Sequence, residues 1–141
     1  MKSFEEVQAA LQDNGWKSVN SGPFMALTGP LWSKKETAGW AYGILSTEKH
    51  LNPAGLVHGG LLQTLMDHAL STLAWEAANR SACVTVQLST QFLATVREGC
   101  LIEARGHVAR HTSSLMFMQG ALSVAGHEVM AAQAIMKILA S

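Results

Sequence analysis

The sequence predicts an α+β fold in which a curved antiparallel sheet of about five to six strands wraps around one long central helix. Three observations support this prediction. Residues 59–78 form an apolar stretch of helical length, residues 84–96 begin a series of four alternating strand candidates, and only short turns separate those candidates. Because consecutive strands joined by short turns pair antiparallel, a single long helix packed against them is the natural core.

The segment before the long helix is expected to hold a short helix and two strands. Ser3 and Glu6 have the spacing of a capping box, and Asn14-Gly15 is a typical helix stop, so residues 1–15 are predicted as an N-terminal helical extension. The two strands are predicted as a hairpin because both stretches are rich in β-forming residues. They span residues 24–32 and 39–47, with breaks at Gly29-Pro30 and Lys34-Lys35.

The segment after the long helix is predicted as four strands. Asn79-Arg80 ends the helical pattern, and the residues that follow alternate between apolar and polar side chains. The predicted strands cover residues 84–96, 100–110, 114–124 and 127–139, separated by Gly99, by the turn RHTSS and by Ala125-Gly126. Residues 1–141 are therefore predicted as a single domain, whose size suits one moderate core.

The composition excludes several classes of function. Of the 141 residues, 48% are hydrophobic and 14% are charged, and the formal net charge is zero, so no basic surface for nucleic acid is expected. The apolar runs are too short to cross a membrane, and the polar start Met1-Lys2-Ser3 lacks the apolar centre of a signal peptide. A cytoplasmic protein is therefore expected, with Cys83 and Cys100 as small core residues in a reducing compartment.

A single carboxylate, Asp67, interrupts the long apolar helix. At about 100° per residue it lies opposite the side expected to face the sheet. That side carries Leu61, Leu62, Leu65, Ala69, Thr72 and Leu73, whereas Asp67 lies among Gly60, Gln63, Thr64, Ser71 and Ala74. Such a small, polar face admits a second backbone, whereas a solvated face carries long charged side chains. The alternative is an ordinary polar residue on a partly wet face, bonded to Ser71 or Thr64, and the pattern alone favours neither.

Gly59 and Gly60 stand where the helix begins. The first N–H groups of a helix lack intrahelical acceptors and carry the positive end of the dipole, so this end can bind an anion or stabilise an oxyanion that glycine lets approach. A tight loop-to-helix turn is the alternative. Gly59 and Asp67 are eight residues apart, or about 12 Å along the axis, so one chain cannot bring both to one reacting carbon. Two antiparallel helices related by a twofold axis can, which predicts a site shared across a dimer.

Other catalytic patterns are absent from the sequence. It contains no Gly-x-Ser-x-Gly, Cys-x-x-Cys or His-Glu-x-x-His motif, and no Lys-Ser/Thr pair follows the glycines as in a phosphate loop. His58 and His68 would lie about 15 Å apart on a helix, so no metal site is expected. His111 lies beside Arg110 in a turn with two interpretations, an ordinary solvated turn or a contact for a phosphate. The first is slightly favoured.

The combination of Asn52, His58-Gly59-Gly60 and Asp67, followed by the strand VTVQLSTQFL, resembles the PaaI-like acyl-CoA thioesterases of the hotdog fold. The resemblance covers about residues 40–139, with a departure at Ala94-Thr95, where proline is common. It implies a long helix wrapped by a curved sheet, dimers with a continuous sheet, and pairs of dimers that often make homotetramers. It also implies hydrolysis of an acyl-CoA thioester (EC 3.1.2.-), with no cofactor beyond the coenzyme A of the substrate.

The resemblance implies a role for each matching residue. Asp67 is expected to act as nucleophile or general base, the Gly59 N–H to polarise the thioester carbonyl, and Asn52 to hold water or the thioester. His58 supports the site beside it, and Thr85 lies on the strand facing the reacting group. The expected substrate-binding residues are Gly60, Gln63, Thr64, Arg110, His111, Thr112 and Ser113, and the cations available for the CoA phosphates are Arg97, Arg105 and Arg110.

Two other functions stay open at this point. A hotdog hydratase or dehydratase needs a His paired with Asp or Glu in a pattern that this sequence lacks, and a non-enzymatic acyl-CoA-binding module would keep the fold without the chemistry. The acyl group, aryl or medium-chain, does not follow from the sequence. The candidates for its pocket are Phe24, Met25, Leu31, Trp32, Met66 and Trp75, although each is favoured as a core residue.

Overall fold

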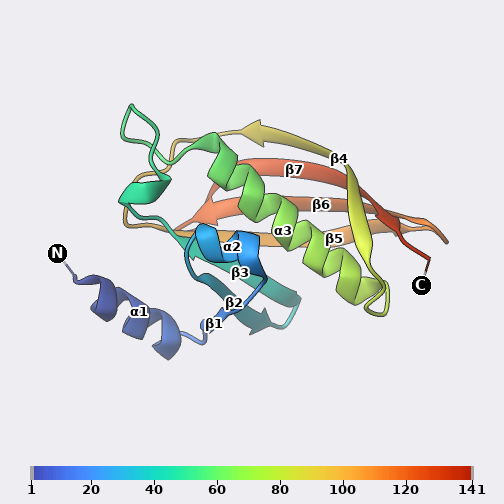
Figure 1. Ribbon diagram of the computed structural model, residues 1–141, viewed down its shortest axis with the longest axis horizontal. Coiled ribbons are helices and arrows are strands. Elements are labelled where there is room, and N and C mark those ends of the chain that lie inside the picture. The colour runs from blue at the N-terminus through green and yellow to red at the C-terminus, as the bar shows by residue number, and fades with distance from the viewer. Residues whose placement is uncertain (1, 141) are drawn as a thin grey trace.

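The computed structural model describes residues 2–140, in which a seven-stranded antiparallel sheet curls around the long helix α3 (Gly59–Ala77) (Figure 1). This arrangement confirms the predicted α+β fold. The strands lie in the order β1-β2-β3-β5-β6-β7-β4. Their bounds are β1 Lys17–Val19, β2 Leu31–Glu36, β3 Gly39–Leu45, β4 Cys83–Phe92, β5 Leu101–His111, β6 Leu115–Val124 and β7 His127–Ile138. Met1 and Ser141, the ends of the predicted domain, lie outside the described residues.

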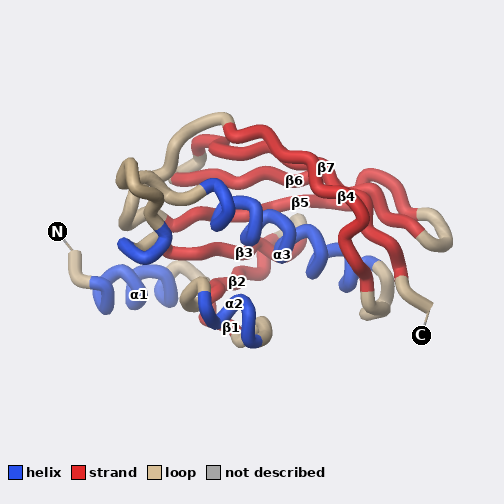
Figure 2. The backbone as a smooth tube through the Cα atoms, turned by 45° about the horizontal axis from the view of Figure 1, so that its top comes forward, coloured by secondary structure: helices blue, strands red, loops and turns tan. Residues whose placement is uncertain are grey.

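The four strands after α3 form where the alternating pattern predicts them, but their order in the sheet differs from their order in the chain. β4 pairs with β7 and not with β5, so it forms one edge of the sheet (Figure 2). It ends at Phe92, short of the predicted residue 96, and the next backbone N–H, of Leu93, bonds the Val129 carbonyl at 2.9 Å. The Val57 N–H bonds the Val96 carbonyl at 2.8 Å. The connection from β4 to β5 therefore runs past the loop that precedes α3.

The strand predicted at residues 24–32 is wrong over its first half, which is the short helix α2 (Pro23–Leu27). Gly22 has a φ of +93°, and Pro23 occupies the first helical turn, where its fixed φ suits a helix. The strand begins only at Leu31, after Gly29 with a φ of +100° has turned the chain. Local backbone chemistry at Gly22-Pro23 therefore overrides the β-forming side chains that follow.

The hairpin itself is confirmed, because β2 and β3 pair antiparallel along their whole length. The turn of the hairpin lies at residues 37–38. Lys34 and Lys35, where the sequence predicts a break, instead belong to β2 and pair with Ala41 and Trp40 of β3. β1 has no predicted counterpart, since a three-residue strand carries too few positions to show an alternation. The sheet therefore has one strand more than the upper end of the expected range.

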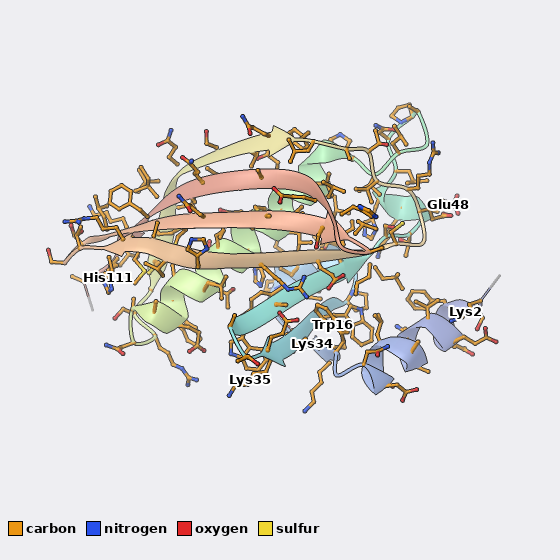
Figure 3. All side chains as sticks on the ribbon, turned by 180° about the vertical axis from the view of Figure 1, so that it is seen from behind. Lys2, Trp16, Lys34, Lys35, Glu48 and His111 are labelled. Atoms are coloured by element: carbon orange, nitrogen blue, oxygen red, sulfur yellow. The ribbon has the colours of Figure 1, made fainter. Side chains whose placement is uncertain are left out.

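α1 (Phe4–Asp13) packs on the outer face of the sheet over β2 and β3, near the edge strand β1. Its start is the predicted capping box: Ser3 Oγ accepts the Glu6 N–H at 3.1 Å, and the Glu6 carboxylate accepts the Ser3 N–H at 3.2 Å. Seen from behind in Figure 3, Trp16 and Lys34 meet at this edge, with Lys34 Nζ 5.9 Å from the Trp16 ring centroid. The small core beneath the helix consists of Leu11, Trp16, Trp32 and Ala41.

The main core lies between α3 and the inner face of the sheet. The buried residues of α3 are Leu62, Leu65, Met66, Ala69, Leu70 and Ala74. The predicted buried side is therefore only partly right: Leu61 and Leu73 are half-buried, and Ala74, placed beside Asp67 by the sequence, is buried. The buried side of the helix extends toward Asp67 because β4 crosses the helix there, and helical periodicity alone does not reveal this crossing.

Within residues 2–140, no helix has the length and hydropathy that a bilayer span requires.

The candidates for an acyl pocket divide into core and surface residues. Met25, Leu31, Trp32 and Met66 are buried. Phe24 and Trp75 keep 62% and 36% of their surface exposed, so these two do not belong to the core. The predicted core cysteines, Cys83 and Cys100, are half-buried against the main core, and burial raises the pKa of the Cys83 thiol.

Two facing glycines let α3 lie directly on the sheet. Gly106 of β5 and Gly120 of β6 are partners in the ladder. A Cβ at Gly120 would lie 2.7 Å from Met66 Cε, 2.8 Å from Leu70 Cδ2 and 2.9 Å from the Arg105 carbonyl oxygen. A side chain at this position therefore displaces the ends of Met66 and Leu70 and meets the backbone of β5.

Replacing Gly120 by alanine is expected to destabilise the protein by about 1–3 kcal/mol, because overpacking displaces core side chains and here also meets a backbone oxygen. Urea unfolding followed by circular dichroism measures this change. Ala121→Ser, at the neighbouring half-buried position, is the matched control and is expected to change stability by less than about 0.5 kcal/mol. Equal stability of Gly120→Ala and the control would contradict the close approach of helix and sheet.

Candidate active site

The start of α3 leaves one backbone donor free. His58 caps the helix: its Nδ1 accepts the Gly60 N–H at 2.8 Å, and its carbonyl accepts the N–H groups of Leu61 and Leu62 at 3.0 and 3.4 Å. Among residues 2–140, the Gly59 N–H has no acceptor. Because unpaired N–H groups at a helix start carry the positive end of the dipole, this donor is suited to a developing negative charge. His58 therefore supports the site as a helix cap.

Each glycine of the pair lies close to a different neighbour. A Cβ at Gly60 would lie 2.9 Å from His58 Nδ1, so this glycine makes room for the capping ring. A Cβ at Gly59 would lie 3.2 Å from Cε1 and 3.3 Å from Cζ of Phe92. From the sequence, the two glycines are explained by ligand access or by a tight turn. The close contacts with His58 and Phe92 are a further reason for small residues at these positions. Phe92 has no role in the sequence prediction, because its contact with Gly59 bridges 33 residues.

The loop before α3 is shaped by two side chains. Asn52 Oδ1 accepts the N–H groups of Ala54 and Leu56 at 2.9 and 3.1 Å, so the oxygen is committed to the loop and only the Nδ2 donors are available to a ligand. His50 is buried: its Nδ1 accepts the Thr47 N–H at 2.9 Å, and its backbone carbonyl accepts the His58 N–H at 2.8 Å. The loop thus holds Asn52 at the same end of the molecule as the free Gly59 N–H.

Asp67 is bonded to β4 and not to its own helix. The Thr85 hydroxyl donates to Asp67 Oδ1 at 2.7 Å, and Ser71 Oγ lies 3.3 Å from Thr85 Oγ1. Thr64, one of the two partners named in the alternative interpretation of Asp67, instead donates to the Gly60 carbonyl at 2.8 Å. Asp67 is half-buried, and within residues 2–140 its second carboxylate oxygen has no hydrogen-bond donor. The arrangement holds one oxygen and leaves the other open to a ligand or to water.

His68 lies beside Asp67 in the chain but faces a different part of the sheet. Its ring is edge-on to Tyr42 of β3, with 6.3 Å between centroids. Burial lowers the pKa of His68, and the nearby Asp67 charge opposes this shift. Burial also raises the pKa of Tyr42 to about 12, assisted by the charge of Glu76. Nowhere in the described chain do three or more His, Cys, Asp or Glu side chains gather as metal ligands.

The turn between β5 and β6 lies at the far end of the molecule. Figure 3 shows His111 at the opposite end from Glu48, which begins the short helix η1 (Glu48–His50) leading into the Asn52 loop. Thr112 closes the turn through hydrogen bonds with Leu115, from which its Oγ1 accepts the N–H at 3.0 Å. The structure therefore brings Asn52, His58 and Gly59 together, and separately Asp67 and Thr85. It does not bring the turn, with Arg110, His111, Thr112 and Ser113, to either group within one chain.

Arg105 is already paired. Its guanidinium donates to both oxygens of Glu36 and to Glu103, each at 2.9 Å. The Arg105 hydrogen bonds lower the pKa of Glu36. Of the arginines considered for the CoA phosphates, Arg105 is thus held by two carboxylates. It also borders a hollow of about 740 Å³ on the outer face of the sheet, whose lining includes no other predicted site residue.

The sequence of residues 54–131 matches the family model described as thioesterase superfamily. The chain belongs to the thioesterase superfamily. One relative, the presumed esterase PA0474 of Pseudomonas aeruginosa, is 31% identical over 104 residues, which cover 72% of this chain and 78% of the relative. The family and this relative support a hydrolase.

Solved structures support the same fold. A hypothetical thioesterase protein of Streptococcus pneumoniae TIGR4, solved with coenzyme A, superposes with a TM-score of 0.71 at 19% identity and covers 83% of this chain and 91% of that one. A presumed thioesterase of Ralstonia eutropha JMP134, related to phenylacetic acid degradation, superposes with a TM-score of 0.65 at 23% identity and covers 92% and 89%. These likenesses confirm that the helix and curved sheet form a hotdog fold of the thioesterase type.

Proposed function

We propose that this thioesterase-superfamily protein is a PaaI-like acyl-CoA thioesterase that hydrolyses an aryl- or medium-chain acyl-CoA to the free acid and CoA. The observation that carries the proposal is the free Gly59 N–H at the start of α3. The same helix carries Asp67, whose carboxylate has one oxygen bonded to Thr85 and the other, within the described chain, free. A thioester carbonyl needs such a donor where negative charge develops during attack. The structural likeness to a thioesterase solved with coenzyme A supports the choice of thiol.

In the proposed reaction the Gly59 N–H donates to the carbonyl oxygen of the thioester. Asp67 removes a proton from water as the water oxygen bonds to the carbonyl carbon, or its carboxylate attacks that carbon directly to give an anhydride that water then opens. The carbon–sulfur bond breaks, and the CoA thiolate leaves and takes up a proton. Thr85 holds Asp67 in position, and Asn52 Nδ2 donates to the water or the thioester. The reaction requires no metal and no cofactor other than the CoA of the substrate.

The proposed active unit is a dimer. Gly59 and Asp67 are separated by about 12 Å on one helix, so the carboxylate at each site comes from the partner chain. β4 is the edge strand next to Asp67, and Val84 and Val86 on it are 44% and 59% exposed, so a second β4 can pair there and continue the sheet. Association of two dimers into a homotetramer and a cytoplasmic location belong to the same proposal.

The substrate would contact both ends of the shared site. The proposed contacts near the thioester are Gly60, Gln63 and Thr64 on the polar face of α3. The turn Arg110–Ser113 is at the far end of its own chain, so its proposed contact with the CoA phosphates requires another subunit to bring it near the thioester (Figure 3). Arg110 is a better candidate than Arg105 for a phosphate, because Arg105 is neutralised by two carboxylates.

A panel of acyl-CoA thioesters with a thiol-reactive dye tests the proposal. We expect free CoA from at least one aryl or medium-chain substrate, and a dimer or larger species by size exclusion at micromolar concentration. Binding of acyl-CoA without release of CoA would replace the proposal by an acyl-CoA-binding module. Hydration of an enoyl-CoA without thioester cleavage would replace it by a hydratase, and a stable, active monomer would overturn the shared site.

Replacing Thr85 by valine is expected to lower kcat about tenfold while KM changes little. Valine keeps the shape of threonine but removes the O–H donor to Asp67, and a hydrogen bond to a charged group contributes about 1.5–3 kcal/mol. Steady-state kinetics on the best substrate of the panel measure the effect. Thr72→Val makes the same change on α3, where the hydroxyl donates only to the His68 carbonyl, and is expected to stay within about twofold of wild type. Equal activity of both variants would remove Thr85 from the site.

A further inference from the structure

The ring of Phe92 lies directly on the backbone of Gly59. Phe92 is the last residue of β4, and two of its ring carbons lie 3.2 and 3.3 Å from the position that a Cβ of Gly59 would occupy. A methyl group at this position would require the ring to shift slightly. The aromatic ring therefore forms one side of the space around the free Gly59 N–H.

The backbone of Phe92 is held in the sheet, while its side chain is half-exposed. Phe92 pairs with the fully buried Met130 on β7, and the following N–H, of Leu93, bonds the Val129 carbonyl at 2.9 Å. Nevertheless 52% of the Phe92 surface is exposed. A large aromatic side chain normally buries most of its area, so a ring that is half-exposed in the single chain, beside an unpaired backbone donor, presents an apolar surface to a bound ligand.

We propose that Phe92 is a specificity-determining residue whose exposed ring contacts the acyl group of the substrate, not its thiol. The inference rests on the proposed thioesterase function and adds the residue that recognises the acyl side. It selects acyl groups with an apolar chain or ring close to the carbonyl over the acetyl group. Sequence pattern gives no hint of this role, because alternation places Phe92 as one more inward-facing strand residue.

The physical basis is the burial of apolar surface next to the reacting carbon. A carbonyl oxygen bonded to the Gly59 N–H places the first carbons of the acyl group near the ring. Each methylene removed from water contributes about a fourfold change in kcat/KM. Two methylenes on the ring thus amount to about a 15-fold preference, whereas acetyl has too little apolar surface to benefit.

Hydrolysis of acetyl-, hexanoyl- and phenylacetyl-CoA by Phe92→Ala and Phe92→Leu tests the role. We expect Phe92→Ala to lower the ratio of kcat/KM for hexanoyl- over acetyl-CoA about 15-fold, while acetyl-CoA hydrolysis stays within about threefold of wild type. Phe92→Leu is expected to show a smaller change in the same direction and preserves an apolar side chain for folding. Leu93→Ala is the matched control: Leu93 is 53% exposed, but the atoms nearest to a Cβ at Gly59 belong to Phe92, so this variant should keep the wild-type ratio.

A second comparison separates the acyl side from the thiol side. Each variant is assayed with the same hexanoyl group on CoA and on N-acetylcysteamine, which lacks most of the CoA. An unchanged effect of Phe92→Ala on both thiols supports an acyl contact, whereas an effect that appears only with CoA would overturn it.

Two other results would overturn the role of Phe92 without touching the proposed function. One is an equal loss of kcat/KM for all three acyl groups, and the other is an unchanged hexanoyl-to-acetyl ratio in folded Phe92→Ala and Phe92→Leu. A wild-type protein that releases no CoA from any substrate would reject the proposed function itself, and the specificity role with it. Circular dichroism and size exclusion establish that each variant is folded and has the wild-type assembly.

Discussion

Replacing Asp67 by asparagine is expected to lower kcat at least about 100-fold without unfolding the protein, because the proposed nucleophile or base is lost. Asparagine has nearly the volume of aspartate, and its amide oxygen can still accept the 2.7 Å hydrogen bond from Thr85. Steady-state release of CoA measures the loss, and urea unfolding measures the stability. The two measurements separate the chemical role of the carboxylate from its structural bond to β4.

Glu76→Gln is the control for this variant, since it removes a carboxylate from the exposed surface of the same helix. We expect it to keep activity within about twofold of wild type. Asp67→Asn with activity within a few-fold of wild type would mean that the Asp67–Thr85 hydrogen bond only joins helix to strand. The thioesterase chemistry would then have to be placed elsewhere.

Activity is expected to return when two inactive variants are combined in one dimer. Gly59→Pro removes the free N–H, and Asp67→Asn removes the carboxylate, so each homodimer has two inactive sites. If the two groups of a site come from different chains, a heterodimer has one site with both lesions and one with neither. It should therefore show about half of the wild-type activity per dimer.

Gly59→Pro is compatible with the local backbone, which makes the experiment practicable. Proline is favoured at the first position of a helix, and His58 before it has φ −61° and ψ 134°, an extended conformation that proline tolerates in its predecessor. The added ring meets Phe92, whose exposed side chain has room to shift. Circular dichroism must show a folded protein before mixing, and tagged copies identify the heterodimer by affinity purification. Confirmed heterodimers without activity would reject the shared site and the argument from the 12 Å offset, taken at about 1.5 Å per residue.

The local features of this protein are determined by the sequence. The capping box at Ser3 and Glu6, the start of α3 at Gly59, and the four strands after it all follow from residues within a few positions of one another. The polar face around Asp67 follows in the same way, because helical geometry fixes which neighbours share a side. One local prediction fails where backbone chemistry competes with side-chain preference, at Gly22-Pro23, which begins α2 inside a predicted strand.

The tertiary structure alone decides which distant residues meet. The pairing of β4 with β7 puts β4 at the sheet edge and brings Thr85 to Asp67, 18 residues away, in place of the helical neighbours Ser71 and Thr64. The same strand carries Phe92 onto Gly59. These contacts depend on how the sheet curves around α3, and periodicity describes only which face a residue occupies, never which strand lies opposite. Residue identity therefore determines the elements and their faces, whereas the order of strands in the sheet determines the partners of Asp67 and Gly59.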